Sequence, residues 1–525
     1  MAMLRCMLFV LVVYATSNCC MSAKKTYLGY TLFQLYPDTE EKLDFLNSIY
    51  NGSHDFEVDF WQPPAKVNSQ IEIFVPPLLK YRVIEDLNSR DIFYNYSMPN
   101  LYRAMEEEQR PASETRARKF RDETSFYLSQ YNSWEEIEIY LKKSASTLRT
   151  VTKLQSIGKS HEGRDLLVIK LGNSKTDSLH RRKPAIWVDG GIHAREWISP
   201  ATLLYMIDTL SHAYEINDTK AQRYLDEIDW YFLPVMNPDG YAYSHTKDRM
   251  WRKNRSPQAC IGRRCCQGVD LNRNFATQWG MSGASRNPCS QTYMGASAFS
   301  EPESKAVQDF VMRHRHALKG FFTFHSFGQL WMYPYGYKKR TYSEDMEELR
   351  DLSNRAVAAL RVIHGTRYKV GTAANILYSA SGASEDWAKA EAKIKYSYCV
   401  ELRPSGFGNG FILAPRFIIP TAEEMWAAMT VVADRIIEQS VVVIAVTVPN
   451  LIVSCYMCYK MGEKPHTGLH YYPSRDDFSY NGDMAGSNDY NRSSHMNVVA
   501  QSSLTPGLRS WNYPYHAYYG GKMRD

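Results

Sequence analysis

The sequence of 525 residues lacks a large overall excess of charge of either sign. Its formal net charge is +6, and it has no basic stripe interleaved with aromatic residues, so we expect no nucleic-acid partner. It also lacks a compositional bias, because 44% hydrophobic and 22% charged residues are ordinary values for a globular protein. At roughly 100 to 200 residues per domain, its length predicts two or three folded units.

The N-terminus has the pattern of a secretory signal peptide, which we place at residues 1–22. Arg5 precedes an apolar run from Met7 to Ala15, and small and polar residues follow. A secreted, extracellular chain can form disulfides. Of its 10 cysteines, four lie close enough in the sequence to form two bonds: Cys260, Cys265, Cys266 and Cys289.

Residues 25–100 have the pattern of a small separate domain. Alternating and helical apolar spacings predict strand 27–36, helix 39–50, strands 55–60 and 70–75, helix 78–89 and strand 91–97. This β-α-β-β-α-β order is that of a ferredoxin-like α+β domain. No set of residues inside it suggests chemistry, so we expect an accessory domain.

Residues 101–121 are rich in charge. Acidic residues at 106–108 are followed by a basic cluster of Arg116, Arg118, Lys119 and Arg121. Such a run is often a solvated face, but this one lies between two predicted domains of a secreted chain. We therefore expect an exposed linker that a trypsin-like protease can cut.

Residues 122–439 alternate strand-like runs with amphipathic helices. Strands are predicted at 166–171, 185–188, 230–233, 321–324 and 396–402, and helices at 133–143, 201–214, 303–314, 346–363 and 422–438. This alternation predicts an α/β domain with a mixed, largely parallel sheet and helices on both faces.

Polar residues follow several of these strands. His193 and Glu196 come just after strand 185–188, and His325 comes directly after strand 321–324. Open α/β sheets place their ligand sites at such strand ends. Two imidazoles and one carboxylate are a ligand set for a catalytic zinc ion, with the fourth position left for water.

Two further groups point to chemistry at the same place. Strand 396–400 runs directly into Glu401. Burying this charge without a partner would cost several kcal/mol. Beside a metal, the carboxylate would act as a base. A loop-rich segment carries Arg252, Asp270, Asn272 and Arg273. Guanidinium and amide donors held in fixed positions can bind a carboxylate. One more guanidinium group can stabilise the negative charge of an oxyanion as it forms in a reaction.

The chain resembles the secreted zinc metallocarboxypeptidases of the pancreatic and digestive A/B type, which are made as zymogens. The motifs that carry the resemblance are GIHAREW, WRKNR, GVDLNRN, TFHSFGQLWMYPYGY, LYSASGASEDW, VELRPSGFGNGFILAP and IIPTAEE. The likeness covers about residues 25–439, so it includes an activation pro-domain at 25–100, an activation linker at 101–121 and a catalytic domain at 122–439. It implies an exopeptidase that releases single C-terminal residues from peptides and proteins.

The resemblance also implies a role for each residue of the site. One Zn²⁺ per chain would be bound by His193, Glu196 and His325, with Asp270 orienting a histidine ligand; Glu401 would act as general base and acid and Arg252 would stabilise the oxyanion; Arg195, Asn272, Arg273, Ser326, Tyr378 and Glu385 would bind the substrate. Cys266 would pair with Cys289. Cys260 and Cys265 are then the remaining local pair, and Cys399 would be a buried free thiol.

The acid at Glu385 predicts the substrate preference. In the family, the residue before this Asp-Trp pair lies at the base of the pocket for the C-terminal side chain, where an acid accompanies Lys or Arg substrates of the B type. Alternatively, Glu385 turns to solvent or pairs with Lys389, which leaves an apolar, A-type pocket lined by Met332, Ala373 and Ala380. A third alternative is a catalytically silent peptide-binding relative. The presence of both histidine ligands, Glu196, Arg252 and Glu401 favours an active enzyme, which we expect to be a monomer.

Residues 440–525 depart from the family pattern. The apolar run after residue 440 is slightly short of the roughly 20 residues that a membrane span requires, and Pro449 interrupts it, yet Lys460 and Lys464 follow on the side of a cytoplasmic tail. A plasma-membrane anchor at 441–459 is therefore one alternative to soluble secretion. The others are a segment packed on the enzyme and an aberrant C-terminus. We expect the tail beyond Lys464 to be disordered.

Overall fold

The structure, a computed structural model, describes residues 24–50, 58–98, 101–119, 126–173, 183–405 and 410–462. It divides the chain into two units, Met1–Ser440 and Val441–Asp525. The predicted signal peptide and the tail that we expect to be disordered lie outside the described residues.

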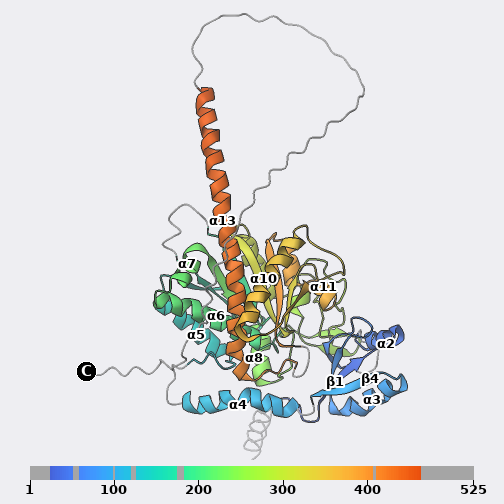
Figure 1. The fold of residues 1–525 in the computed structure, drawn as a ribbon. Helices are drawn as coiled ribbons and strands as arrows, with labels where there is room; N and C mark the ends of the chain where they lie inside the picture. The colour runs from blue at the N-terminus through green and yellow to red at the C-terminus, as the bar shows by residue number, and fades with distance from the viewer. Residues whose placement is uncertain are drawn as a thin grey trace, which may run out of the picture. The chain divides into compact units, whose positions relative to one another are not determined.

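The N-terminal domain has the predicted β-α-β-β-α-β order. Its strands are β1 (Thr31–Tyr36), β2 (Asp59–Gln62), β3 (Ile71–Val75) and β4 (Phe93–Met98), and its helices are α2 (Glu40–Tyr50) and α3 (Lys80–Ser89). The strands form an antiparallel sheet in the order β2-β3-β1-β4. Figure 1 labels β1 and β4 of this sheet together with α2 and α3. Alternate strand residues such as Phe33 and Ile73 pack with Leu46 and Val83 of the two helices, so one face of the sheet forms the domain's core.

The other face of this sheet packs on the following domain. Leu32, Trp61 and Phe74 form one buried cluster with Met250 and Phe411 of the larger domain. Because the cluster is buried and apolar, it ties the two domains together through the hydrophobic effect.

The segment after this domain is a helix, α4 (Leu101–Lys119), rather than an exposed linker throughout. Leu101, Met105 and Glu108 recur at helical spacing and are buried, so the first half of the helix packs against the protein. The Glu108 carboxylate accepts two hydrogen bonds from the Arg249 guanidinium, at 2.7 and 2.8 Å. Arg116, Arg118 and Lys119 of the basic cluster lie on the last turns of α4, and Arg121 lies outside the described residues.

The larger domain has the predicted mixed, largely parallel sheet. Its eight strands follow the order β13-β12-β14-β11-β7-β8-β6-β5. They are β5 (Thr152–Lys159), β6 (Asp165–Leu171), β7 (Ala185–Gly190), β8 (Asp229–Leu233), β11 (Leu318–Gly328), β12 (Leu330–Tyr333), β13 (Lys369–Thr372) and β14 (Tyr396–Ser405). The four central strands are parallel, and antiparallel pairs occur only toward the two edges.

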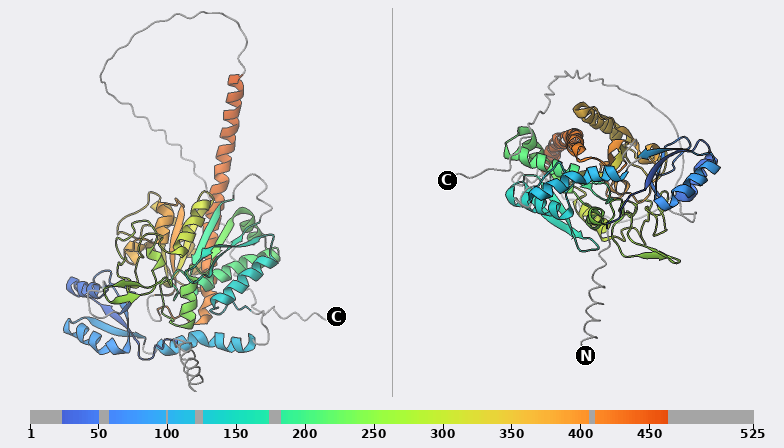
Figure 2. Two further views of the ribbon diagram at one scale, coloured as in Figure 1. Left: turned by 180° about the vertical axis from the view of Figure 1, so that it is seen from behind. Right: turned by 90° about the horizontal axis from the view of Figure 1, so that it is seen from below.

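Helices cover both faces of this sheet, as predicted (Figures 1 and 2). One face packs on α5 (Trp134–Thr147), α6 (Ile198–Glu215), α7 (Thr219–Glu227), α8 (Pro238–Thr246), α10 (Met346–His364) and the part of α13 (Ile418–Gly462) up to Ile437. The other face packs on α9 (Pro302–His314) and α12 (Ser384–Ala390). Neighbouring strand residues such as Ile186 and Trp187 belong to opposite cores, which explains why the central strands read as continuous apolar runs.

Two disulfides brace the loops before the site. Cys266 bonds Cys289 and Cys260 bonds Cys265, while Cys399 is buried and free, as expected. The Cys260–Cys265 bond joins β9 (Ala259–Ile261) to β10 (Arg264–Cys266), which form a two-stranded hairpin. Both bonds agree with the expectation of an oxidising, extracellular environment.

Helix α13 extends beyond the predicted 422–438 as far as Gly462. The anchor proposed for 441–459 falls within it. Among the helices that the structure describes, none is long and apolar enough to cross a membrane, so the anchor receives no support.

Candidate active site

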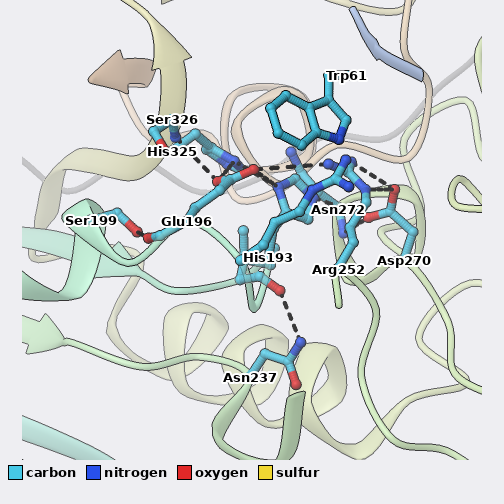
Figure 3. Close-up of polar contacts among 12 residues, drawn as sticks. Trp61, His193, Glu196, Ser199, Asn237, Arg252, Asp270, Asn272, His325 and Ser326 are labelled. Carbon is cyan, nitrogen blue, oxygen red and sulfur yellow. Dashed lines mark hydrogen bonds and ion pairs between the residues drawn. The ribbon is translucent and has the colours of Figure 1, made fainter. Parts of the chain in front are cut away.

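The candidate residues converge at the carboxyl ends of β7, β11 and β14 (Figure 3). His193 and Glu196 lie on the turn that follows β7. His325 and Glu401 lie opposite each other in the register of the parallel strands β11 and β14. Parallel strands end at one edge of a sheet, so residues far apart in the sequence meet there.

His193, Glu196 and His325 are buried and face one another. The Nδ1 atom of His193 is 2.8 Å from Glu196 Oε1 and 3.1 Å from Nδ1 of His325. His325 Nδ1 is 3.2 Å from the second carboxylate oxygen, Glu196 Oε2. The backbone N–H of Ser326 donates to the same oxygen at 3.2 Å and helps to fix the carboxylate.

This arrangement fits a metal ion. Nε2 of His193 is 3.1 Å from Asp270 Oδ1, and because a carboxylate only accepts, Nε2 carries the proton and Nδ1 presents its lone pair. Two imidazole nitrogens and one carboxylate oxygen at these separations match neighbouring ligands around zinc, which stand about 3.3 Å apart at zinc–nitrogen distances of about 2.0 to 2.1 Å. A cation of this type would compensate the buried Glu196 charge.

Asp270 links the candidate metal site to Arg252. Its second oxygen accepts from Nε and a terminal nitrogen of Arg252, at 3.1 and 2.8 Å. Burial alone would raise the pKa of Asp270, but Arg252 and His193 beside it hold that pKa well below its ordinary value. Asp270 is therefore a carboxylate that orients both His193 and Arg252.

Glu401 is the candidate general base. Burial and the neighbouring Glu196 raise the pKa of Glu401, His325 and Arg252 oppose the shift, and the resulting pKa is about 8. Its Oε2 atom has no hydrogen-bond partner in the part of the chain that the structure describes. A carboxyl group with such a pKa can both accept and return a proton near neutral pH.

Three residues form a candidate reader of a terminal carboxylate. Asn272 accepts a hydrogen bond from the Ser384 backbone N–H at 2.9 Å, which leaves its amide NH₂ group as a donor. Arg273 donates to the backbone of Gly283 at 2.8 Å, and its guanidinium lies 6.0 Å from the centre of the Tyr378 ring. The structure thus brings Asn272, Arg273 and Tyr378 together as expected.

Glu385 is turned inward, in the first turn of α12. Burial raises the pKa of Glu385, while His325 and Arg273 oppose the shift. Its Oε2 atom has no partner among the described residues. Lys389 does not pair with it, because Lys389 Nζ donates to Asp345 Oδ2 at 2.7 Å. The alternative in which Glu385 turns to solvent or pairs with Lys389 is therefore wrong.

Residues of the N-terminal domain also reach this site, which the sequence analysis missed. Asp59 forms an ion pair with the buried Arg195, and the indole N–H of Trp61 donates to the same carboxylate at 3.1 Å. The Trp61 ring lies against Phe411 and against Gly410, where a Cβ atom would stand 2.1 Å from the ring. Asp59 and Trp61 lie on one face of β2. An acid and a tryptophan on the face that does not pack in the domain's own core could have indicated from the sequence that this face contacts another part of the protein.

Tyr50, the last residue of α2, reaches the carboxylate reader itself. Its hydroxyl lies within hydrogen-bonding reach of the Thr292 side chain. Burial raises the pKa of Tyr50, whereas Arg273 and Arg252 act on it in the opposite sense. The phenol therefore lies within electrostatic range of the two guanidinium groups that a bound carboxylate would need.

Comparison with known proteins gives two family matches. Residues 137–428 match the family model described as zinc carboxypeptidase, and residues 33–108 match the one described as carboxypeptidase activation peptide. Carboxypeptidase B of Astacus astacus is 40% identical over 306 residues, which are 58% of this chain and 97% of that protein. Carboxypeptidase A2 of Mus musculus is 36% identical over 413 residues, which are 79% of this chain and 95% of that protein.

Solved structures with the same fold also include a carboxypeptidase. The crystal structure of thrombin activatable fibrinolysis inhibitor is 33% identical, with a TM-score of 0.68, and the match covers 78% of this chain and 100% of that one. Carboxypeptidase A from Helicoverpa armigera is 29% identical, with a TM-score of 0.70 over 79% of this chain and 98% of that one. The relatives carry both A-type and B-type names, so the likeness by itself leaves the substrate preference open.

Proposed function

The chain belongs to the zinc carboxypeptidase family and carries an activation peptide, and from that premise we propose that it releases C-terminal Lys and Arg residues after a trypsin-like protease has cut it. It is a metallocarboxypeptidase that uses a catalytic zinc ion. The proposal adds the roles of individual residues, the substrate preference, the activator and secretion as a soluble monomer.

In this proposal, His193, Glu196 and His325 hold the zinc ion through two Nδ1 atoms and a carboxylate. When bound, zinc supplies a Lewis acid that polarises the scissile carbonyl and lowers the pKa of water. Asp270 fixes the orientation of His193, as its 3.1 Å contact with Nε2 supports.

Glu401 takes the proton from the attacking water and then gives it to the leaving amine. Its raised pKa supports both steps, because the group is neither permanently ionised nor permanently neutral at working pH. Arg252 lies where negative charge develops on the carbonyl oxygen and stabilises it.

The substrate is read at its free end. Asn272, Arg273 and Tyr378 hold the terminal carboxylate, while Arg195 and Ser326 line the adjoining substrate site. An endopeptidase would have no use for a carboxylate reader next to its reacting centre, so this group supports exopeptidase activity.

The preference for Lys and Arg depends mainly on one observation, the inward-facing Glu385 with an unpartnered oxygen in the described part of the chain. A buried carboxylate without a partner is costly, and an arriving ammonium or guanidinium group removes that cost. An apolar side chain would leave the cost in place. Glutamate is also one methylene longer than aspartate, the acid of typical B-type enzymes, which would shorten the pocket.

The activation peptide keeps the uncut chain latent. Asp59 pairs with Arg195, and Tyr50 lies within electrostatic range of Arg273 and Arg252, so the N-terminal domain occupies groups that the substrate would need. The basic cluster on and after the last turns of α4 is where we propose that a trypsin-like protease cuts. Secretion is supported by the signal-like N-terminus and by two disulfides.

The roles of ligand and base are separable by mutation. We expect His193→Ala and His325→Ala to lose zinc and activity together, because each removes a ligand. Glu401→Gln should keep zinc and lose about 10²- to 10⁴-fold in kcat, because only proton transfer is removed. Metal analysis of the purified variants checks the division. Loss of zinc from Glu401→Gln would show that the assignment of roles is wrong.

Latency depends on the uncut activation segment. Joint replacement of Arg116, Arg118, Lys119 and Arg121 by Gln should leave a precursor that trypsin does not activate cleanly. Hydrolysis of a peptide substrate before and after trypsin treatment measures this, with the unaltered precursor as the control. Full activity of the uncut precursor would refute the proposed latency.

Substrate preference depends on the charge of Glu385. Glu385→Gln keeps the size of the side chain and removes its charge. We therefore expect kcat/KM for peptides ending in Lys or Arg to fall about 30-fold, which corresponds to a loss of transition-state stabilisation on the order of 2 kcal/mol. Glu385→Ile should favour Phe and Leu. Because the pKa of Glu385 is raised, the ratio of Lys to Phe release by the wild type should increase as pH rises and the carboxyl group ionises. Faster release of Phe than of Lys and Arg by the wild type would contradict the B-type assignment.

A further inference from the structure

A buried chain of hydrogen bonds lies behind His325. Nε2 of His325 is 3.1 Å from Thr323 Oγ1, and Thr323 Oγ1 donates to Asp189 Oδ1 at 2.8 Å. The other oxygen of Asp189 accepts from the Trp187 indole N–H at 2.7 Å. Asp189, Thr323 and His325 are all buried.

The three residues are held by regular strands. Thr323 and His325 lie two residues apart on β11, so their side chains leave the same face of the sheet. Asp189 lies directly opposite Thr323 in the register of β7 and β11. Two positions earlier on the same face, Trp187 and Phe321 belong to an apolar core. Burying polar side chains beside that core costs free energy, which their hydrogen bonds offset.

The hydrogen bonds from Asp189 to His325 allow one consistent placement of their protons. A threonine hydroxyl has a single proton, and Thr323 gives it to Asp189, so its lone pair faces Nε2 of His325. Nε2 must then be the protonated nitrogen, and Nδ1 presents its lone pair toward His193 and Glu196. Burial raises the pKa of Asp189, the hydrogen bonds from Trp187 and Thr323 oppose the shift, and the resulting pKa is about 6, so the group accepts hydrogen bonds as a carboxylate above that pH.

We propose that Thr323 and Asp189 are positioning residues of the metal centre, which hold the Nε2–H of His325 so that its Nδ1 atom faces the metal. The proposal rests on the proposed role of His325 as a ligand. The two histidines are then held differently: His193 by a carboxylate directly, and His325 by a hydroxyl that a carboxylate orients. Partners of this kind fix the tautomer and ring orientation of a ligand, and their removal typically weakens metal binding about 10- to 100-fold.

Two substitutions test the hydroxyl. Thr323→Val removes it at nearly constant volume, so we expect the zinc dissociation constant of the full-length chain, measured by competition with a chelator, to rise about 10- to 100-fold. Thr323→Ser keeps the hydroxyl and should stay within about threefold of the wild type. Thr202→Val is the matched control, because Thr202 is also fully buried and its hydroxyl has no partner in the described part of the chain.

Asp189→Asn tests the donor and acceptor directions of these hydrogen bonds. Trp187 can only donate, so the new amide must keep its oxygen toward the indole and turn its NH₂ group toward Thr323. Thr323 would then give its proton to Nε2, which selects the wrong tautomer of His325. We expect zinc affinity to fall at least as far as in Thr323→Val. If Thr323→Val does not fold, as judged by its circular dichroism, Asp189→Asn and Thr323→Ser decide the question.

The outcomes separate this proposal from the one on which it rests. Unchanged zinc affinity in Thr323→Val, together with zinc loss in His325→Ala, would refute the positioning role and leave the ligand role intact. Retained zinc in His325→Ala would refute the ligand role itself. An equal loss of affinity in Thr202→Val would mean that any lost core hydroxyl has this effect, which also overturns the proposal.

Discussion

Two imidazoles and a carboxylate buried at one point are the constraint on which the rest of this structure depends. A buried carboxylate is costly unless a cation compensates it, and the Nδ1 atoms of His193 and His325 leave a compensating site beside Glu196. The parallel strands β7, β11 and β14 bring these groups together because they end at one edge of the sheet. The apolar cores on both faces of the sheet hold that edge in place.

The activation peptide contacts the larger domain close to the same edge of the sheet, near Phe327 at the end of β11. Its sheet uses one face for its own core and the other for contact with the larger domain, through Trp61 and Phe74. That contact pairs Asp59 with Arg195 and brings Tyr50 within electrostatic range of Arg273. In the uncut chain, the N-terminal domain thus contacts groups that we propose bind the substrate, and the buried ion pair of Glu108 with Arg249 joins α4 to the larger domain.

Sequence periodicity predicted the elements whose burial is regular. The central strands and the long helices were found because each buries both faces or one continuous stripe, whereas β5, β12 and β13 at the sheet edges were missed. The candidate zinc ligands were found because His325 directly follows an apolar strand, and His193 and Glu196 lie on the turn just after another one. Asp59, Tyr50 and Asp189 were not found, because each contacts residues more than a hundred positions away in the sequence. Thr323 lies only two positions from His325, but a single threonine within an apolar strand gives no sign of the Asp189 carboxylate that orients it. Glu108 was assigned to a solvated run because its partner, Arg249, lies on a distant loop.

X-ray absorption at the zinc K edge of the purified chain tests the central claim most directly. The account predicts one zinc ion with two histidine nitrogens at about 2.0 to 2.1 Å, oxygen ligands at about 2.0 to 2.2 Å and no sulfur. A sulfur shell at about 2.3 Å, or a spectrum without the scattering of two imidazole rings, would contradict it.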